Sequence, residues 1–422
     1  MEKIIALILF ALTFVLLLAL PRYRINVALI SAAVFVLSGI MPYNKVLQII
    51  DYNVIMMIAG TMGIVSLFIE SNMPSLLANK LINRAGGIKA ATIMLALFAG
   101  FISAFIDNVA TVLMIAPVAL DIAKKLNISP VTPIVAIAVS SNLQGAATLV
   151  GDTTSILLGG HAGLDFLDFF IFKGKLGIFF VVQAGAVAAT ICLLLLLRKT
   201  KGGINHMGSV QVKDYFPTAL LVGMVTLLIG ASLLPEKPSI INGLICMALF
   251  IIGLIRKAAK EGVKQCVINI KEIDYITVGL LACLFIIVGG ITEVGAISDI
   301  SLIFARAGNN NLFATYTIIV FASVFISAFI DNIPYVAAML PVTAGIAAML
   351  NVEPYILYFG LLSGATLGGN LTPIGASANI AALGILRKQG IKVTTGEFMK
   401  IGVPFTLAAV ITGYILIWII WS

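Results

Sequence analysis

The six residues SAFIDN occur twice in the chain, at positions 103–108 and again at positions 327–332. Each copy places an aspartate followed by an asparagine inside strongly apolar sequence. A charged side chain at the bilayer centre costs at least about 2.5 kcal/mol on insertion scales, and acids inside a membrane are usually functional. A repeated motif of this kind predicts a repeated structural unit with a polar site between apolar helices.

The motif is the most similar part of a longer internal repeat. At an offset of 224 residues, positions 101–127 match positions 325–351 at 15 of 27 residues without gaps. Further along the chain, the same offset pairs several glycines, threonines and prolines. We predict two units, residues 1–200 and residues 216–422, joined by a cytoplasmic linker at residues 201–215.

The composition is that of a protein with many membrane spans. The chain is 61% hydrophobic and 10% charged, and apolar runs of about 20 residues recur along it. The longest polar stretches, residues 198–214 and 256–272, have the length of loops, so we expect no soluble catalytic domain and no enzyme activity. The four cysteines show no CxxC spacing and the two histidines lie in expected loops, which argues against a zinc or haem cofactor.

Apolar runs between proline, glycine and charged residues predict ten membrane crossings. They lie at residues 4–20, 25–41, 52–69, 131–158, 175–197, 216–234, 239–256, 273–292, 355–386 and 401–421. Two further apolar regions, residues 88–125 and 311–350, each carry a polar break at the midpoint. Each region is either two tight spans or a re-entrant hairpin, and both possibilities return the chain to the side that it left.

The distribution of basic residues predicts the orientation. This topology puts 20 of the 26 Lys and Arg residues on one side and six on the other. Basic residues gather on the cytoplasmic side of membrane proteins, so both termini are expected outside a bacterial-type cytoplasmic membrane. The net charge of +8 therefore reflects orientation among membrane lipids, and we expect no nucleic-acid partner.

The fold class follows from the crossings and the repeat. Each unit contains five crossings, an odd number, so the second unit enters the membrane from the opposite side. We predict an all-α polytopic protein built from two inverted repeats of five transmembrane helices, each with a re-entrant hairpin and a broken helix. Inverted repeats recur in secondary transporters, whose substrate site lies near the midplane where discontinuous helices expose backbone polar groups.

Two predicted spans are too polar in the middle to be continuous lipid-facing helices. Residues 131–160 would measure about 45 Å as one helix, whereas the hydrocarbon core is about 30 Å thick. Irregular backbone is tolerated at this depth where it is buried or lines a cavity, which predicts broken helices at residues 131–158 and 355–386. The expected helix-break glycines are Gly145, Gly151, Gly369 and Gly375, and the candidate ion or substrate ligands are Ser141, Asn142, Thr148, Asp152, Thr153, Thr366, Asn370, Thr372, Ser377 and Asn379.

The hairpin tips admit two interpretations. Asp and Asn are favoured N-cap residues, so the two SAFIDN motifs could simply cap the helices that follow them. Because Asn or Ser would cap without a buried charge, we favour a role in binding an ion or a proton. The candidates are Asp107, Asn108, Thr111, Asp331 and Asn332, and a sodium ion would use Asp107, Asn108, Asp331 and Asn332. Glu70 and Glu293 are expected to be solvated near an interface. The central motifs contain no Lys or Arg.

Four segments resemble one transporter group. They are SAFIDNVATVLMIAP (103–117), SNLQGAATLVGDTTSILLGG (141–160), SAFIDNIPYVAAMLP (327–341) and GGNLTPIGASANIAALG (368–384). They are similar to the ArsB/NhaD-type permeases of the ion transporter superfamily, which include arsenite permeases, sodium/proton antiporters and the melanosomal P protein, and distantly to the divalent-anion/sodium symporters. The resemblance implies alternating access by an elevator-like or rocking motion, and a homodimer.

The residues and the resemblance together predict a secondary active transporter. If a proton and a cation compete for Asp107 or Asp331, that competition couples opposed fluxes. The leading hypothesis is proton-coupled transport, either sodium/proton antiport or arsenite-type efflux, with a small inorganic ion or anion as substrate and Na⁺ or H⁺ as coupling ion. Alternatives are a sodium-coupled permease for citrate, a dicarboxylate or another small anion, a passive channel, and, remotely, an intramembrane aspartyl protease.

Overall fold

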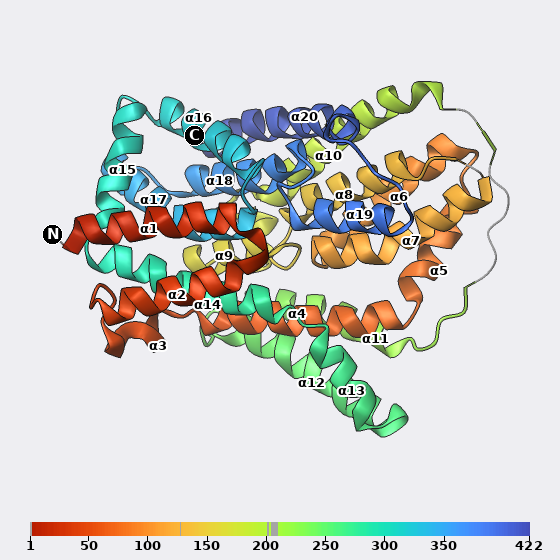
Figure 1. Ribbon diagram of the computed structural model, residues 1–422, viewed down its shortest axis with the longest axis horizontal. Helices are drawn as coiled ribbons and strands as arrows, with labels where there is room; N and C mark the ends of the chain where they lie inside the picture. Colours follow the sequence, from red (N-terminus) through yellow and green to blue (C-terminus); the bar gives the residue numbers. More distant parts are fainter. Residues whose placement is uncertain (1, 127, 201, 204–209) are drawn as a thin grey trace.

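A computed structural model describes residues 2–126, 128–200, 202–203 and 210–422. Asn127, at the end of the first repeat block, and residues 201 and 204–209 of the expected linker lie outside these described residues. Figure 1 shows an elongated molecule of helices, most of which run roughly along its long axis. Within the described ranges, the only strands are the paired two-residue segments β1 (Ile171–Phe172) and β2 (Lys175–Leu176).

The first half of the described chain is a series of helices. They are α1 (Glu2–Ala19), the 3-10 helix η1 (Pro21–Tyr23), α2 (Arg24–Leu37), η2 (Tyr43–Lys45), α3 (Val46–Ile49), α4 (Tyr52–Glu70), α5 (Met73–Ile82), α6 (Ile88–Ser103), α7 (Asn108–Leu126), α8 (Val131–Gly145), α9 (Thr153–Ala162), η3 (Leu167–Phe169), α10 (Ile178–Leu196) and η4 (Leu197–Lys199).

The second half has a similar order of helices. They are α11 (Phe216–Ser232), α12 (Ile241–Glu261), α13 (Val263–Lys271), α14 (Tyr275–Glu293), α15 (Ala296–Ala307), α16 (Leu312–Ser327), α17 (Asn332–Leu350), α18 (Tyr355–Gly368), η5 (Gly369–Leu371), α19 (Ser377–Lys388) and α20 (Thr395–Trp421). Helices α7 and α17 both have 19 residues and begin 224 residues apart, because 332 minus 108 is 224. The inversion of the second copy stays a prediction.

The helices confirm an all-α polytopic membrane protein. Among the described residues, seven helices are long and apolar enough to cross a membrane, and an eighth span results if α15 and α16, bent by 111°, count as one. Two of the ten expected crossings, α2 and α11, have only 14 and 17 residues. The expected broken spans consist of still shorter helices, α8 with α9 and α18 with α19.

The polar stretch at residues 256–272, which has the length of a loop, is largely helical. Helix α12 continues to Glu261, Gly262 breaks it with a φ of +88°, and α13 follows. Positive φ is readily available to glycine, which explains the break. Val263, Cys266, Val267 and Ile270 of α13 have the i, i+3, i+4, i+7 spacing of a helix face, but the segment is short and also contains Ile268 outside this pattern.

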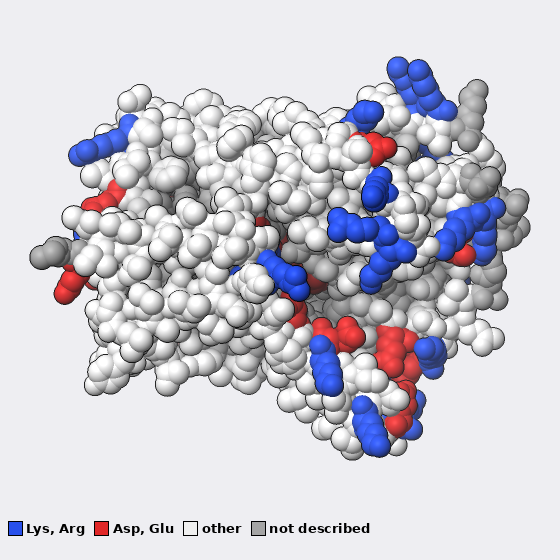
Figure 2. Space-filling model, viewed as in Figure 1, with Lys and Arg blue, Asp and Glu red and all other residues white. Residues whose placement is uncertain are grey.

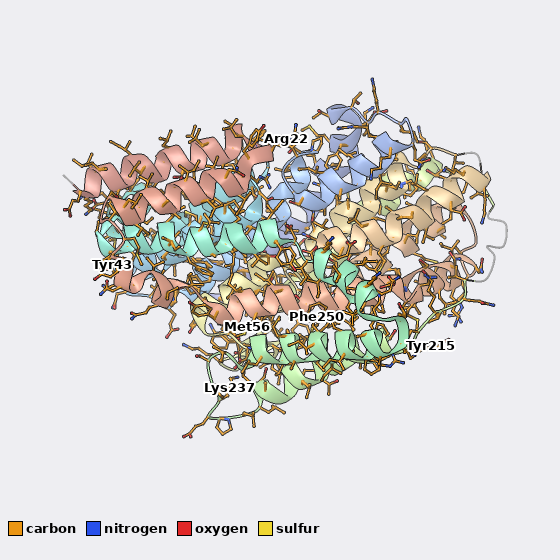
Figure 3. All side chains as sticks on the ribbon, turned by 60° about the horizontal axis from the view of Figure 1, so that its bottom comes forward. Arg22, Tyr43, Met56, Tyr215, Lys237 and Phe250 are labelled. Atoms are coloured by element: carbon orange, nitrogen blue, oxygen red, sulfur yellow. The ribbon has the colours of Figure 1, made fainter. Side chains whose placement is uncertain are left out.

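The two SAFIDN motifs form the turns of helix hairpins, α6–α7 and α16–α17. The hairpins extend toward the middle of the molecule from its right and left ends (Figure 1). Each packs against the broken helix of its own half, α6 on α8 and α16 on α18. The apolar core runs between these helices and the long helices around them, including α4, which packs along α12 at the level of Met56 and Phe250 (Figure 3).

The break in each broken helix requires glycine because a hairpin tip lies against it. A Cβ on Gly151 would lie 2.9 Å from the carbonyl oxygens of Ser103 and Ala104. A Cβ on Gly375 would lie 2.7 Å from the carbonyl oxygens of Ser327 and Ala328. Since real Cβ atoms do not approach oxygens this closely, the absence of a side chain allows the tip and the break to pack together.

Candidate functional site

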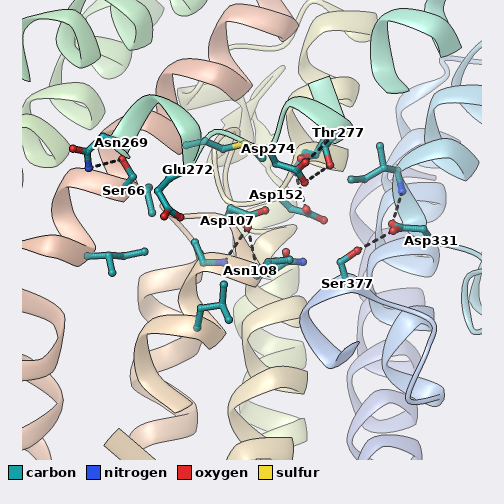
Figure 4. A pocket seen from close by; sticks show the side chains of 18 of the residues that line it. Ser66, Asp107, Asn108, Asp152, Asn269, Glu272, Asp274, Thr277, Asp331 and Ser377 are labelled. Carbon is teal, nitrogen blue, oxygen red and sulfur yellow. Dashed lines mark hydrogen bonds between the residues drawn. The ribbon is translucent and has the colours of Figure 1, made fainter. Parts of the chain in front are cut away.

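Both hairpin tips reach one cavity of about 570 Å³. It is lined by α4, α13, the N-terminal residues of α7, α9, α14, α17 and α19, and the residues just before them (Figure 4). Six carboxylates and no Lys or Arg are among the described residues that line it. The six are Glu70, Asp107, Asp152, Glu272, Asp274 and Asp331. Figure 2 shows acidic side chains in and beside a hollow near the middle of this face.

The aspartates at the hairpin tips cap helices and also line the cavity. Asp107 accepts hydrogen bonds from the backbone amides of Val109 (3.0 Å) and Ala110 (3.1 Å) at the start of α7. Asp331 accepts a longer one, 3.4 Å, from the amide of Ile333 at the start of α17. The capping and ligand interpretations are therefore compatible, because each carboxylate caps its helix while it faces the cavity.

Asp152 connects the two halves of the chain. It is 3% exposed and N-caps α9 by accepting from the Thr153 amide (2.8 Å) and the Thr154 hydroxyl (2.7 Å). The side-chain amide of Asn332, at the second hairpin tip, donates to the same carboxylate at 3.1 Å. The break of the first broken helix and the tip of the second hairpin thus share a carboxylate.

Asp331 has a partner that the sequence analysis missed. One guanidinium nitrogen of Arg24 lies 2.6 Å from its Oδ2, and the Ser377 hydroxyl donates to the same oxygen at 2.9 Å. Arg24 is 307 residues away in sequence and begins α2. The central motifs themselves contain no basic residue, but tertiary packing brings one to the second tip.

Behind the cavity, four asparagines join the halves. The Asn108 amide donates to Asn142 at 2.9 Å, and Asn142 donates to Asn370 at 2.7 Å and to Asn379 at 3.1 Å. All four side chains are buried. Buried amides that satisfy one another hold their helices in one arrangement, so this network fixes both broken helices relative to the first hairpin.

Several predicted hydroxyl ligands bond to the protein instead of facing the cavity. Thr148 donates to the carbonyl of Ala104, and Thr372 donates to that of Ala328, the equivalent contact in the second half. Ser141 donates to the carbonyl of Asn108 at 2.9 Å. These contacts hold the hairpin tips against the broken helices.

The structure divides the predicted ligands into two groups. Those that line the cavity are Asp107, Asn108, Asp152, Thr153, Asp331, Asn332 and Ser377. Those buried outside the lining are Thr111, Ser141, Asn142, Thr148, Thr366, Asn370, Thr372 and Asn379. Thr366 meets Thr154 at 3.2 Å, and the Thr111 hydroxyl has no hydrogen-bond partner in the described part of the chain.

Glu70 lines the cavity and its side chain is 42% exposed, which agrees with the solvated position that the sequence suggested. Its carboxylate accepts hydrogen bonds from Lys257 and, at 3.1 Å, from the Asn269 amide. Lys257 is 8% exposed and also donates to Asn269 at 2.7 Å. Asp274 is another missed lining residue. With the offset shortened by one residue to 223, residues 50–52 (Ile-Asp-Tyr) match residues 273–275, so Asp274 corresponds to Asp51 and this relation could have drawn attention to it.

A second cavity of about 430 Å³ lies at the opposite ends of α4 and α9. Tyr52 and Gly160 line it, whereas Glu70 and Thr153, at the other ends of the same helices, line the first cavity. Asp51 lines the second cavity and Asp274, its counterpart in the repeat, lines the first. The two cavities therefore lie at opposite ends of the same two helices, and each contains one member of this aspartate pair.

The cavity has the chemistry of a site for positive charge, without a preformed multidentate metal centre. Carboxylate and amide oxygens are ligands suited to hard cations. Within the described residues, no group of three or more His, Cys, Asp or Glu side chains is arranged to hold a metal ion. The four residues expected to bind sodium, Asp107, Asn108, Asp331 and Asn332, all line the cavity.

Comparisons with known proteins cover nearly the whole chain. A family model described as citrate transporter matches residues 7–267 and 245–422. An uncharacterized transporter of Mycobacterium tuberculosis is 31% identical over 440 residues, which cover 99% of this chain and 98% of that protein. The P protein of Homo sapiens is 24% identical over 470 residues, which cover 90% of this chain and 55% of that protein. The YdaH transporter of Alcanivorax borkumensis has a similar fold, with a TM-score of 0.59, 15% identity, and coverage of 89% of this chain and 87% of that one.

Proposed function

This chain belongs to the citrate transporter family and is a secondary transporter, and we propose that it couples substrate movement to a proton or a sodium ion by alternating access. The observation that carries the proposal is the lining of the first cavity, with six carboxylates and no Lys or Arg among its described residues. The family and its relatives are transporters, so the intramembrane protease alternative has no support.

Electrostatics favours a positive occupant. Two unit charges 4 Å apart interact by about 4 kcal/mol at the effective dielectric constant near a protein surface. Arg24 and Lys257 already offset the charges of Asp331 and Glu70. The other four carboxylates, Asp107, Asp152, Glu272 and Asp274, have no ion pair among the described residues. They repel one another, and a bound cation or proton relieves that repulsion. Because no preformed cluster of three metal ligands is present among the described residues, a proton or a monovalent cation suits the cavity better than a tightly chelated divalent ion.

Competition at one carboxylate provides coupling. Asp107 and Asp152 receive hydrogen bonds from neutral groups, so either can hold a proton or contribute to a sodium site. If binding of one ion excludes the other, the two ions must move in opposite directions across the cycle. The first and second cavities, at opposite ends of α4 and α9, would then provide access from the two sides in turn.

Two substrate classes follow from this cavity. The first is an inorganic ion, moved by sodium/proton antiport or by proton-coupled efflux of a small oxyanion such as arsenite. No cysteine lies among the described lining residues, so arsenite would enter by hydrogen bonding and not by thiolate capture. The second is citrate or a dicarboxylate, favoured by the description of the family. A carboxylate would need an accompanying cation, because alone it would meet the acidic wall.

We further propose a homodimer in a bacterial-type cytoplasmic membrane, with both termini outside. Both ends of the chain lie in the left half of Figure 1, and in Figure 2 the Lys and Arg side chains gather over the right half of the molecule and its lower projection. This distribution supports an orientation with the right half toward the cytoplasm.

Flux in proteoliposomes tests the proposed function. Sodium and proton gradients are imposed separately, and movement of protons, sodium, citrate and arsenite is recorded. We expect a sodium gradient to drive proton movement, or one of the two gradients to drive uptake of citrate or arsenite against its own gradient. Downhill flux alone, with neither gradient able to drive uphill movement, would identify a passive channel.

A further inference from the structure

The two SAFIDN aspartates have different electrostatic surroundings. Asp107 accepts from two backbone amides, and no Lys or Arg in the described part of the chain forms an ion pair with it. Asp331 is paired with Arg24 at 2.6 Å. The repeat therefore places equivalent carboxylates at the two tips, and the fold supplies a positive charge to one of them.

Arg24 reaches the second tip from a helix of the first half. It is the first residue of α2, which packs against α14. Next to Arg24, the side chain of Ile25 approaches Gly279 of α14, where a Cβ would lie 2.9 Å from its Cδ1. On the same helix, Thr277 lines the first cavity. The backbone of Arg24 is thus anchored outside the hairpin whose aspartate it contacts.

Asp331 lines the first cavity, and its ion pair with Arg24 is not fully buried. The Arg24 side chain is 23% exposed and that of Asp331 is 7% exposed. Removing one partner from a buried ion pair leaves an uncompensated charge, which is strongly unfavourable. The Asp331 carboxylate therefore needs a positive charge beside it in each state of the transporter. Either Arg24 or a bound cation can supply this charge.

We propose that Arg24 is a tethered counter-ion of Asp331, which neutralises the second hairpin tip when no transported cation is bound and is displaced when one binds. This inference rests on the proposed function, because it presupposes a cation at the tips. Arg24 is then a positioning residue that lowers the apparent affinity of the site for cations. Its ion pair with Asp331 also connects the α16–α17 hairpin to α2 in the empty state, and binding of a cation breaks this ion pair.

Removal of Arg24 should increase the affinity of the site for cations. A site that is available for only a fraction of the time has an apparent dissociation constant equal to the intrinsic one divided by that fraction. If Arg24 occupies Asp331 nine-tenths of the time, its removal strengthens cation binding about tenfold. Maximal turnover falls, because release of the tighter-bound cation is slower. A purely structural arginine would lower the yield of folded protein without increasing cation affinity.

Thermal unfolding of the purified full-length protein in detergent tests this, with sodium as the probe. Sodium chloride replaces choline chloride at constant ionic strength, and the sodium concentration at half-maximal stabilisation is measured. For Arg24→Gln we expect a concentration about tenfold lower than for the wild type, and for Arg24→Lys a value close to the wild type. Arg22→Gln is the matched control, because it removes the same charge from an exposed residue at the turn between α1 and α2 (Figure 3).

A double variant keeps the test decisive if Arg24→Gln folds poorly. Arg24→Gln combined with Asp331→Asn leaves neither charge unpaired, so we expect it to fold. Against Asp331→Asn alone, it should show no further change in the sodium midpoint, because the effect of Arg24 passes through Asp331. An unchanged or higher midpoint in Arg24→Gln, or a further shift in the double variant, would overturn the role of Arg24. Wild-type flux without ion coupling would instead overturn the proposed function itself.

Discussion

Asp107 combines two roles that a single substitution can separate. Its carboxylate caps α7 through the amides of Val109 and Ala110, and it faces the first cavity without a basic partner in the described chain. Asparagine caps helices about as well as aspartate does. Replacing Asp107 by Asn therefore removes the charge and keeps the cap.

For Asp107→Asn we expect weaker cation binding with little loss of stability. Hydrogen bonds and contacts to a charged group contribute about 1.5–3 kcal/mol, so the affinity for sodium should fall by about tenfold or more. The unfolding temperature without sodium should stay close to that of the wild type. Asp121→Asn, on the exposed face of the same helix, is the control, because its ion pair with Lys125 lies at the surface. Equal effects of the two substitutions on sodium binding would contradict a role for Asp107 in the site.

For single residues, the sequence predicts the acids that line the cavity but not the residues that contact them in the fold. Asp107, Asp152 and Asp331 were expected in a common site because buried acids and a repeat single them out, and all three line the first cavity. Arg24 was not expected, since its contact with Asp331 joins residues 307 positions apart. Such contacts depend on the packing of α2 and α14, which no local pattern encodes.

At the level of helices, the contact between hairpin tip and helix break leaves no room for a side chain at Gly151. Gly151→Ala would place a Cβ within 2.9 Å of three carbonyl oxygens, so the tip of α6–α7 must move away from the break. We expect a loss of about 1–3 kcal/mol in stability, as for other overpacked sites, together with loss of transport. Gly384→Ala in α19 is the control, because a Cβ there meets nothing within 4 Å. Full transport by the Gly151 variant would show that this contact does not position the site.

An ion pair between Asp214, just before α11, and Arg256 of α12 is expected to depend on pH. Hydrogen bonds from Arg256 lower the pKa of Asp214 below its ordinary value of 3.8. A carboxyl with a lowered pKa contributes stability at neutral pH and loses it as the pH falls through its folded pKa. Because Asp214 is 31% exposed, Arg256→Gln should cost at most about 1 kcal/mol at pH 7. That difference should shrink below about pH 4, as measured by thermal unfolding over a range of pH.

The helix hairpins are the elements that sequence reasoning located best. Their expected limits, residues 88–125 and 311–350, agree within one residue with α6–α7 and α16–α17. When an apolar run ends at a capping motif, the sequence defines the ends of the helix closely. Helix α13 was missed because its nine residues are too few to show a clear period, and its place on the first cavity wall depends on packing against α4.

For the whole molecule, the two cavities at opposite ends of α4 and α9 predict access from opposite sides of the membrane. Val109→Cys reports on the first cavity and Ile50→Cys on the second, in a background that lacks the four native cysteines. We expect a membrane-impermeant thiol reagent to reach the two positions from different sides. Sodium should change their reactivities in opposite directions if one cavity opens as the other closes. Labelling of both positions from the same side would contradict alternating access through these cavities.

The most direct test of the account is sodium-driven proton movement in proteoliposomes, measured for the wild type and for the double variant Asp107→Asn with Asp331→Asn. The account predicts that an imposed sodium gradient drives proton movement in the wild type, and that the double variant, which retains its asparagine caps, drives none. Coupled movement at the wild-type rate in the double variant would contradict the central claim that these two carboxylates bind the coupling ion.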